Sequence, residues 1–334
     1  MERLRMGLLG CSGHYALRVA TPLKFSLLVE PYAVASRDTA KAGKFAKTWD
    51  FPVSYGSYEG LLADPKVDFV YIPLPNHLHF EYIKKAADAG KPILCEKPLC
   101  LNAKDAAEAA EYCGKKKIPL MEAFMYRFHP QWVRAAEIVK SGELGEVLSI
   151  HAVFSYNNKD RANIRNKADC GGGAILDIGC YAVSTSRLLM GREPEKVSAT
   201  LVRDKDFKTD ILCSAILDYG EGRASAFTVS TQMFPFQQVS AFGTAGSLSV
   251  EIPFNMPCDI PGKLTVATGV AKRIVETEIA DQYLLEFDAF ALSLIEKTEV
   301  PTPVSDAVAN MAVLDAVFAA AASGRWESVK GRGA

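Results

Sequence analysis

The sequence predicts a chain of two domains, of α/β and α+β class. A doubly wound parallel sheet comes first, and an open-faced, mostly antiparallel β-sheet domain with helices on one face follows. Two observations support this prediction. Over about the first 120 residues, short and almost wholly apolar runs alternate with helical patterns, as in parallel strands buried on both faces. After about residue 145, polar and apolar residues alternate within the runs, which is typical of a sheet with one solvated face.

The first domain is expected at residues 1–122, and its strand–helix alternation indicates a Rossmann fold. The expected strands are apolar runs that end at turn or charged residues: Leu4–Leu9, Tyr32–Ser36, Phe69–Pro73, Pro92–Cys95 and Pro119–Met121. The expected helices lie between them: Tyr15–Phe25, Thr39–Trp49, His77–Ala89 and Ala103–Lys116.

The second domain is expected at residues 123–330. Its strands are alternating or β-branched runs joined by turns: Val147–Tyr156, Val197–Val202, Ile211–Tyr219, Ala224–Ser230, Gln237–Phe242 and Ser247–Ile252. Helices are expected at Ala174–Met190, Tyr283–Glu296 and Ser305–Ser323. The last two of these helices can pack back across the domain boundary.

Composition and charge exclude several classes of protein. The 334-residue chain has a formal net charge of −1 with Lys and Arg spread along it, so it lacks the basic stripe expected of a protein that binds nucleic acid or an anionic membrane. The longest apolar stretch, Met311–Ala322, is interrupted by Asp315 and is too short to span a bilayer. The first residues lack the features of a signal peptide, so we expect a cytoplasmic protein.

Eight cysteines are scattered without a CxxC pair or a Cys/His cluster at zinc spacing. We therefore expect free thiols in a reducing compartment and no metal site.

A glycine-containing turn follows the first strand. Glycines there allow the backbone to turn tightly and to approach a pyrophosphate, whose charge then lies at the N-terminus of the next helix. The spacing G-x-x-G-x-x-A is one residue longer than the usual dinucleotide-binding pattern, but its position at the first strand of a βαβ run favours the same function. The residues expected to contact the dinucleotide are Gly10, Cys11, Ser12, Gly13, His14 and Tyr15.

The end of the second strand bears on the choice between NADP and NAD. An NAD site places Asp or Glu here to bind the ribose 2′-hydroxyl. This chain has Ser36 and Arg37, with Lys41 one helical turn later, and a guanidinium and an ammonium on one face suit a 2′-phosphate. Asp38 complicates this interpretation unless it caps the following helix. We predict NADP(H) in preference to NAD(H).

Three motifs follow in order along the chain: PNxxH at residues 75–79, AGKxxLCEKP at 89–98 and GGGAxLDIGCY at 171–181. Together they resemble the Gfo/Idh/MocA oxidoreductases, in particular the branch that includes dimeric dihydrodiol dehydrogenase, NADP-dependent D-xylose dehydrogenase and glucose–fructose oxidoreductase. The resemblance covers nearly the whole chain. It implies further contacts on the cofactor side from Pro73, Leu74, Asn76, His79, Glu96, Lys97 and Arg127.

The last motif carries the expected chemistry. Asp177 and Tyr181 are four residues apart, so they share one face near the N-terminus of a helix. Oxidation of an alcohol by hydride transfer needs a group that takes the hydroxyl proton, and a nearby ammonium lowers the pKa of a tyrosine enough for that role. We predict Tyr181 as the acid/base. By the resemblance, Lys97 is its electrostatic activator, and Asp177 is expected to accept a substrate hydroxyl and orient it.

Further substrate contacts are expected around the domain boundary. The segment at 125–129 resembles an aromatic-x-Arg-Phe segment of the same branch, which implies that Met125, Tyr126 and His129 border the substrate. His129 can equally be a helix-start histidine with a local hydrogen bond. Arg165 either binds sugar hydroxyls or forms a surface ion pair.

These residues predict an NADP(H)-dependent oxidoreductase that transfers a hydride to or from a sugar, a polyol or a trans-dihydrodiol. The alternatives are a non-catalytic NADP-binding sugar sensor or repressor and an NAD-dependent glycosidase. We expect the first domain to bind the cofactor and the second to bind substrate. A homodimer or tetramer is expected to form through the sheet of the second domain.

Overall fold

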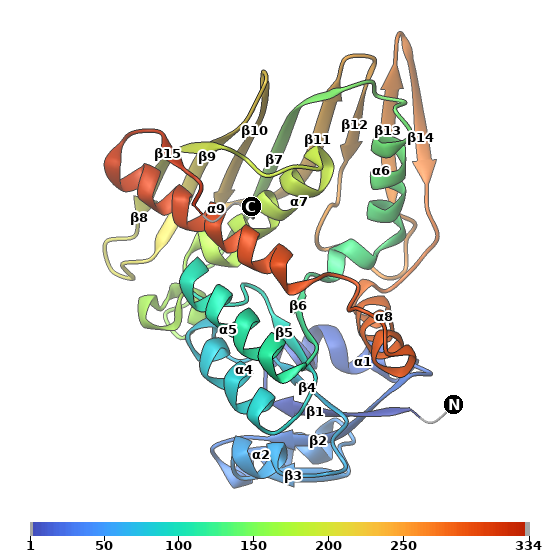
Figure 1. Ribbon diagram of the computed structural model, residues 1–334, viewed down its shortest axis with the longest axis vertical. Helices are drawn as coiled ribbons and strands as arrows, with labels where there is room; N and C mark the ends of the chain where they lie inside the picture. Colours follow the sequence, from blue (N-terminus) through green and yellow to red (C-terminus); the bar gives the residue numbers. More distant parts are fainter. Residues whose placement is uncertain (1–2, 331–334) are drawn as a thin grey trace. The chain divides into compact units, whose positions relative to one another are not determined.

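The computed structural model describes residues 3–330, and the chain divides into two compact units (Figure 1). The first unit contains residues 3–125 and 281–308, and the second contains residues 126–280 and 309–330. The sequence placed the whole of 123–330 in the second domain. The structure differs because the segment 281–308 makes its contacts with the first unit.

The first unit is built on a six-stranded sheet in the order β3-β2-β1-β4-β5-β6, in which every pair is parallel. This is the strand order of the Rossmann fold, as predicted. The strands are β1 (Leu4–Leu9), β2 (Val29–Ala35), β3 (Val53–Tyr55), β4 (Phe69–Ile72), β5 (Ile93–Glu96) and β6 (Leu120–Ala123). The short strand β3 was not predicted, because three half-exposed residues carry no readable period.

Helices cover both faces of this sheet (Figure 1). They are η1 (Tyr15–Val19), α1 (Ala20–Leu23), α2 (Thr39–Thr48), α3 (Tyr58–Leu62), η2 (Asn76–Leu78), α4 (His79–Asp88) and α5 (Ala103–Lys116). The N-terminus of α5 is fixed by Asn102, whose side-chain oxygen accepts the N–H of Asp105 at 2.8 Å. The bounds of α5 are those that the sequence predicted.

Helix α8 (Gln282–Glu296) joins the first unit although it lies far along the chain. It begins at Asp281, whose carboxylate accepts two N–H groups of its first turn. Phe290 packs edge-on against Phe69 of β4 with ring centroids 5.5 Å apart, and Phe287 contacts Tyr71 in the same way at 4.9 Å. Both phenylalanines are fully buried, which confirms them as core residues.

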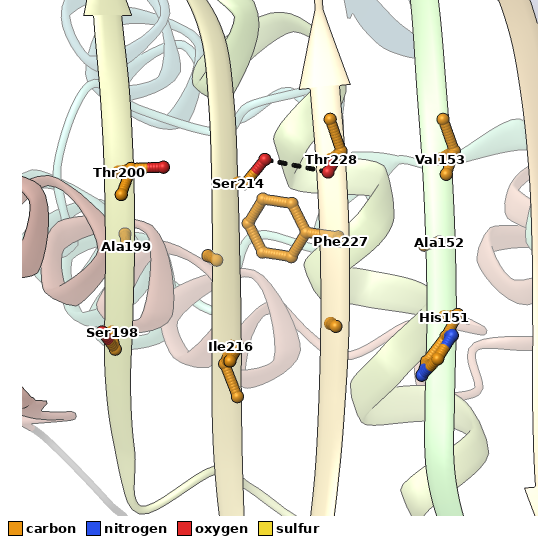
Figure 2. Close-up of a pocket in the computed structure, with 12 residues that line it drawn as sticks. His151, Ala152, Val153, Ser198, Ala199, Thr200, Ser214, Ile216, Phe227 and Thr228 are labelled. Carbon is orange, nitrogen blue, oxygen red and sulfur yellow. Dashed lines mark hydrogen bonds between the residues drawn. The ribbon is translucent and has the colours of Figure 1, made fainter.

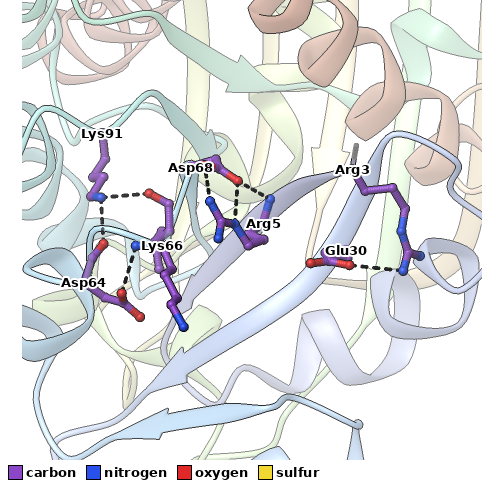
Figure 3. Close-up of polar contacts among 8 residues, drawn as sticks. Arg3, Arg5, Glu30, Asp64, Lys66, Asp68 and Lys91 are labelled. Carbon is purple, nitrogen blue, oxygen red and sulfur yellow. Dashed lines mark hydrogen bonds and ion pairs between the residues drawn. The ribbon is translucent and has the colours of Figure 1, made fainter. Parts of the chain in front are cut away.

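Ion pairs tie the strands of the first sheet together near their amino ends (Figure 3). Arg5 donates through Nε and Nη2 to the two oxygens of Asp68, at 3.0 and 3.1 Å, which joins β1 to the start of β4. Lys91 donates to the carbonyl oxygens of Asp64 and Val67 at 2.8 and 2.7 Å. These contacts fix the end of the sheet opposite to the one where ligands bind in such folds.

The second unit contains a nine-stranded sheet in the order β14-β13-β12-β11-β7-β10-β9-β8-β15. The pair β7–β10 is parallel, and the other pairs are antiparallel. The strands are β7 (Val147–Asn157), β8 (Lys196–Arg203), β9 (Asp210–Gly220), β10 (Arg223–Ser230), β11 (Gln232–Gly243), β12 (Gly246–Val250), β13 (Lys263–Thr268), β14 (Ala271–Glu276) and β15 (Glu327–Ser328). The sequence did not predict β13–β15.

The helical segments of the second unit include α6 (Pro130–Lys140) and η6 (Ile175–Gly179), which continues into α7 (Cys180–Met190); both α6 and α7 contact the sheet. The short segments η3 (Met125–Phe128), η4 (Ile164–Asn166) and η5 (Ala168–Cys170) are 3₁₀ turns. Helix α9 (Val304–Ser323) closes the chain, and its residues 309–323 belong to this unit.

The face of the second sheet that carries His151 is more exposed and mixed in polarity. Along β9 the side chains alternate, with Ala215 and Leu217 buried and Ile216 46% exposed. Figure 2 shows a shallow depression of about 400 Å³ on this face, where Ser214 and Thr228 share a hydrogen bond of 2.9 Å. This alternation is typical of an antiparallel sheet with one covered face.

Helix α9 is long and apolar enough, by length and composition alone, to cross a membrane, and half of its most apolar stretch is buried. The sequence had suggested a shorter apolar segment. Its buried residue Asn310 donates to the carbonyl oxygen of Cys180 at 3.2 Å and accepts from Arg187 at 3.3 Å. Arg187 in turn binds Glu193 through Nε and Nη2 at 2.6 and 2.7 Å. These polar contacts are those of a core helix packed on α7.

We predict that Asn310→Ala destabilises the protein, because it leaves a buried carbonyl and one guanidinium N–H without this partner. The expected loss is about 1–3 kcal/mol in the free energy of unfolding, measured by urea titration. Ser305→Ala removes an exposed hydroxyl from the same helix and should change that free energy by less than about 0.5 kcal/mol. Equal effects of the two substitutions would contradict a packing role for Asn310.

Candidate active site

The turn after β1 approaches its neighbours closely. Gly10 has a φ of +104°, and a Cβ at that position would lie 2.8 Å from the side chain of Leu74. An added Cβ at Gly13 would meet no atom within 4 Å. Ser12 closes the turn, because its Oγ accepts the N–H of His14 at 3.1 Å. The turn is therefore a tight backbone cradle that is open on one side, which fits a pyrophosphate.

The end of β2 lies against the same turn. The thiol of Cys11 contacts the carbonyl oxygen of Lys41 at 3.7 Å, and Ser36 is buried with its Oγ accepting the N–H of Asp38. Asp38 accepts the N–H of Lys41 at 3.0 Å and so caps α2. The carboxylate of Asp38 is therefore used to cap the helix, whereas the side chains of Arg37 and Lys41 are exposed. This arrangement suits a 2′-phosphate better than a 2′-hydroxyl.

Glu96, at the end of β5, is the centre of a polar cluster. Its Oε1 accepts the hydroxyl of Tyr71 at 2.5 Å and lies 3.3 Å from Nε2 of His14. Burial by itself would raise the pKa of Glu96, but His14, Tyr71 and the ammonium of Lys97 lower it to about 2. Glu96 is therefore a carboxylate at neutral pH, and it places a negative charge beside Lys97.

The loop that carries Lys97 is fixed by two further contacts. The peptide bond between Lys97 and Pro98 is cis. Nδ1 of the fully buried His79 lies 2.9 Å from the carbonyl oxygen of Pro98, and its Nε2 lies 2.8 Å from that of Leu74. Glu122 accepts the N–H of Leu99 at 2.7 Å. The sequence suggested His79 as a cofactor contact, and the structure places its ring between two loops instead.

Other predicted cofactor residues lie nearby. Pro73 and Asn76 are half-buried at the end of β4. The ring of Tyr15 points into the core, with its centroid 5.5 Å from that of Phe51 and 6.1 Å from that of Phe45. A cofactor contact from Tyr15 would therefore have to come from its backbone.

In the second unit, Asp177 joins two side chains from other elements. Its Oδ2 accepts the hydroxyl of Tyr156, at the end of β7, at 2.6 Å and Nε of Arg165, in η4, at 2.9 Å. Asp177 raises the pKa of Arg165 further above its usual value. Among the described residues the Nη groups of Arg165 make no hydrogen bond, and 38% of its side chain is exposed. Arg165 is thus both an ion-pair partner and a donor available to a ligand.

Tyr181 lies one helical turn after Asp177, among aromatic rings. Its centroid is 5.0 Å from that of Phe254, 5.8 Å from that of Phe154 and 5.8 Å from that of Tyr126. Tyr181 is thus held rigidly by rings on three sides.

Arg127 and Tyr126 are both attached to α7. The Oγ of Ser184 in α7 accepts a hydrogen bond from Nη2 of Arg127 and lies 2.7 Å from the hydroxyl oxygen of Tyr126. Tyr126, a predicted substrate contact, is fully buried and packs against Trp132 at 5.1 Å. The structure therefore gives Tyr126 a role in packing, and Arg127 remains half-buried.

The choice left open for His129 is settled by its contacts. It is fully buried, and its Nδ1 accepts the N–H of Gln131 at 3.2 Å, so it caps α6. Met125, the other candidate in this segment, is 4% exposed.

Sequence reasoning missed Tyr71, Tyr156 and Ser184. Tyr71 and Tyr156 lie on strands where an alternating or apolar pattern already accounts for an aromatic residue, so nothing marked their hydroxyls as partners of Glu96 and Asp177. The only available signal was their position near the end of a strand.

Glu96 also predicts a pH dependence. Its pKa falls from an ordinary 4.5 to about 2 on folding, so its stabilising contribution is fully present above pH 4.5 and is lost as the pH falls towards 2. We predict that the difference in free energy of unfolding between the wild type and Glu96→Gln shrinks by up to about 3 kcal/mol over that range. The exposed Glu299→Gln is the control and should show a difference that does not change with pH. A constant difference for Glu96→Gln would contradict the predicted pKa.

All eight cysteines are free thiols, and within residues 3–330 no group of three or more His, Cys, Asp or Glu residues could hold a metal ion.

Comparison with known proteins identifies the family. Residues 4–124 match the model of an oxidoreductase family with an NAD-binding Rossmann fold, and residues 132–249 match the GFO/IDH/MocA C-terminal domain. The chain is 39% identical to D-xylose 1-dehydrogenase (NADP(+)) 2 of Haloferax volcanii, over 96% of this chain and 98% of that protein. It is 34% identical to the trans-1,2-dihydrobenzene-1,2-diol dehydrogenase of Bos taurus, over 68% of each chain.

Among solved structures, a 3-ketoreductase from Actinomadura kijaniata in complex with NADP and TDP-benzene superposes with a TM-score of 0.90. It is 29% identical, and the match covers 96% of this chain and 98% of that one. The two family models, the relatives and this fold agree with the motifs that contain Lys97 and Tyr181. The chain therefore belongs to the Gfo/Idh/MocA family of oxidoreductases.

Proposed function

We propose that this oxidoreductase transfers a hydride between NADP(H) and a CH–OH or carbonyl carbon of a sugar, a polyol or a trans-dihydrodiol. The observation that carries the proposal is the cluster around Asp177. It gathers a carboxylate, a phenol and a partly exposed guanidinium one helical turn from Tyr181. Several hydroxyl-binding groups at one place suit a polyhydroxylated ligand better than an apolar one.

The exposed pair Arg37 and Lys41 supports NADP(H) as the cofactor, because Asp38 is engaged in capping α2. The D-xylose dehydrogenase relative is named for NADP(+), and the 3-ketoreductase was solved with NADP. When bound, the nicotinamide supplies the acceptor or donor of the hydride.

In the mechanism, the tyrosinate form of Tyr181 takes the proton of the substrate hydroxyl as the hydride leaves carbon, and the resulting phenol returns that proton in the reverse direction. The ammonium of Lys97, on the loop fixed by His79 and Glu122, stabilises the tyrosinate.

Asp177 orients the substrate. Its Oδ2 already holds Tyr156 and Arg165, so these two side chains become substrate contacts in the proposal, through the phenol oxygen and the Nη groups. Asp177 itself is proposed to accept a substrate hydroxyl.

The exposed face of the second sheet is proposed to pair with a second copy of the chain, in a homodimer or tetramer. Ile216, which lines the depression of Figure 2, exposes 46% of its surface, and Val202 of β8 and Phe242 of β11 expose 50% and 43%. Light scattering on the purified protein measures the subunit number.

The free thiols support a reducing, cytoplasmic location.

The substrate class is tested by following NADPH absorbance with D-xylose, hexoses, polyols and trans-dihydrodiols. Net formation of NADPH from NADP+ supports the proposal. Cleavage of glycosides without net NADPH would support a glycosidase, and binding without turnover would support a sensor.

We predict that Tyr181→Phe lowers kcat by about 10²- to 10⁴-fold, because the ring remains but the proton-transfer group is lost. The Kd for NADPH, measured by calorimetry, should not change. Tyr112→Phe, which removes a surface hydroxyl bonded to Asp88, is the control and should behave like wild type. A kcat near that of wild type in Tyr181→Phe would overturn the assignment.

We predict that Arg37→Ala raises the Kd for NADPH by about 10- to 100-fold, because a charged hydrogen bond to the 2′-phosphate is lost. The Kd for NADH, which lacks that phosphate, should stay within about twofold. Lys44→Ala removes an exposed cation from α2, the helix that follows Arg37, and serves as the control. Parallel weakening of both cofactors by Arg37→Ala would argue against 2′-phosphate recognition.

A further inference from the structure

Asp210 is a buried carboxylate at the first residue of β9, with 2% of its surface exposed. Its Oδ2 accepts the N–H of Ile175 at 2.7 Å. Its Oδ1 lies so close to Gly173 that a Cβ at 173 would stand 2.2 Å away. Gly173 has a φ of +123°, so its backbone also favours glycine. Asp210 therefore lies directly against the start of η6.

That start also carries the loop of Arg165. The N–H of Gly173 donates to the carbonyl oxygen of Arg165 at 2.9 Å, and the N–H of Asp177 donates to that of Gly173 at 3.1 Å. A Cβ at Gly172 would lie 2.4 Å from the carbonyl oxygen of Arg165. The glycine turn thus touches Asp210 on one side and the Arg165 loop on the other.

The backbone at Asp210 is itself held in place by the sheet and by the loop before it. In the sheet it is the register partner of Arg203 of β8. The preceding loop is closed by Asp204, which accepts the N–H groups of Asp206 and Phe207 at 2.7 and 2.9 Å and the side-chain amide of Gln232 at 3.0 Å. Asp210 therefore connects a rigid sheet end to a glycine turn that has little rigidity of its own.

Burial of this carboxylate carries a cost. Burial raises the pKa of Asp210, and the N–H groups that donate to it, beginning with that of Ile175, oppose the rise. Within the described part of the chain Asp210 forms no ion pair. Burying a carboxyl group costs free energy, and both oxygens of Asp210 lie against the glycine turn. This points to a need for that turn to be held in place.

We propose that Asp210 is a positioning residue, which holds the glycine turn so that Asp177, Tyr181 and Arg165 keep one fixed arrangement for catalysis. The proposal rests on the proposed hydride transfer, since it assigns Asp210 to the same site. Asp210 acts through the backbone at 173–175 and touches no reacting atom. A misplacement of about 1 Å at a reacting group can cost 10²-fold in rate, so the effect should appear in kcat.

The first test is hydrogen–deuterium exchange of the full-length apo protein, which needs no activity. Asp210→Ala should speed amide exchange at 173–178 by at least about tenfold, because an acceptor of the helix N–H groups is lost. Asp218→Ala is the matched control, since Asp218 lies at the other end of β9 and accepts the N–H of Gly220 at 2.8 Å. Exchange at 173–178 that stays at the wild-type rate in Asp210→Ala overturns the proposal.

The second test is kinetic, with NADP+ and D-xylose or whichever sugar the wild type oxidises fastest. Asp210→Ala should lower kcat by about 10- to 100-fold with a smaller change in KM and an unchanged Kd for NADPH. Asp210→Asn, which keeps one oxygen acceptor and guards against failure of the alanine variant to fold, should recover part of the rate. A kcat equal to that of wild type in both variants, or an equal loss in Asp218→Ala, overturns the proposal.

The two proposals fail in different ways. A wild-type chain that reduces no NADP+ with any of the substrates contradicts the oxidoreductase function, while the exchange rates at 173–178 still decide the role of Asp210.

Discussion

One carboxylate oxygen, Oδ2 of Asp177, organises the chemistry of the second unit. It accepts hydrogen bonds from a phenol at the end of β7 and from a guanidinium nitrogen in η4, so side chains from three separate elements meet at a single atom. Hydrogen bonds to an ionised acceptor are shorter and stronger than neutral ones, which fixes the directions of Tyr156 and Arg165. Every role assigned to these side chains depends on that atom staying in place, and hence on the glycine turn before it.

The first unit solves a similar problem around Lys97. A flexible side chain becomes useful for catalysis only when its loop is fixed, and here buried hydrogen bonds from His79 and Glu122 fix the residues that follow it. Glu96 adds a negative charge at the preceding position, held by Tyr71. Both units therefore use buried polar side chains to hold the groups that we propose to face a ligand.

The use of buried side chains to hold other side chains explains why some residues predicted to contact a ligand instead contact the protein itself. His79, Tyr126 and His129 are fully buried, and each has a polar side-chain atom within hydrogen-bond distance of another protein atom. From sequence, a polar or aromatic residue within a motif looks the same whether it binds a ligand or holds the residue that does. Arg165 forms an ion pair with Asp177 and still exposes 38% of its side chain, so neither of its two interpretations excludes the other.

The sequence by itself determined the alternation of strands and helices in the first unit, the glycine turn, the cationic strand end and the four-residue spacing of Asp177 and Tyr181, because each depends on local periodicity or spacing. The tertiary structure decided what depends on long-range contacts. It placed α8 with the first unit through Phe287 and Phe290, and it brought Tyr156 to Asp177. It also set Asp210 against Gly173, since a glycine with positive φ and a buried acid thirty-seven positions later carry no shared signal until the sheet brings them together.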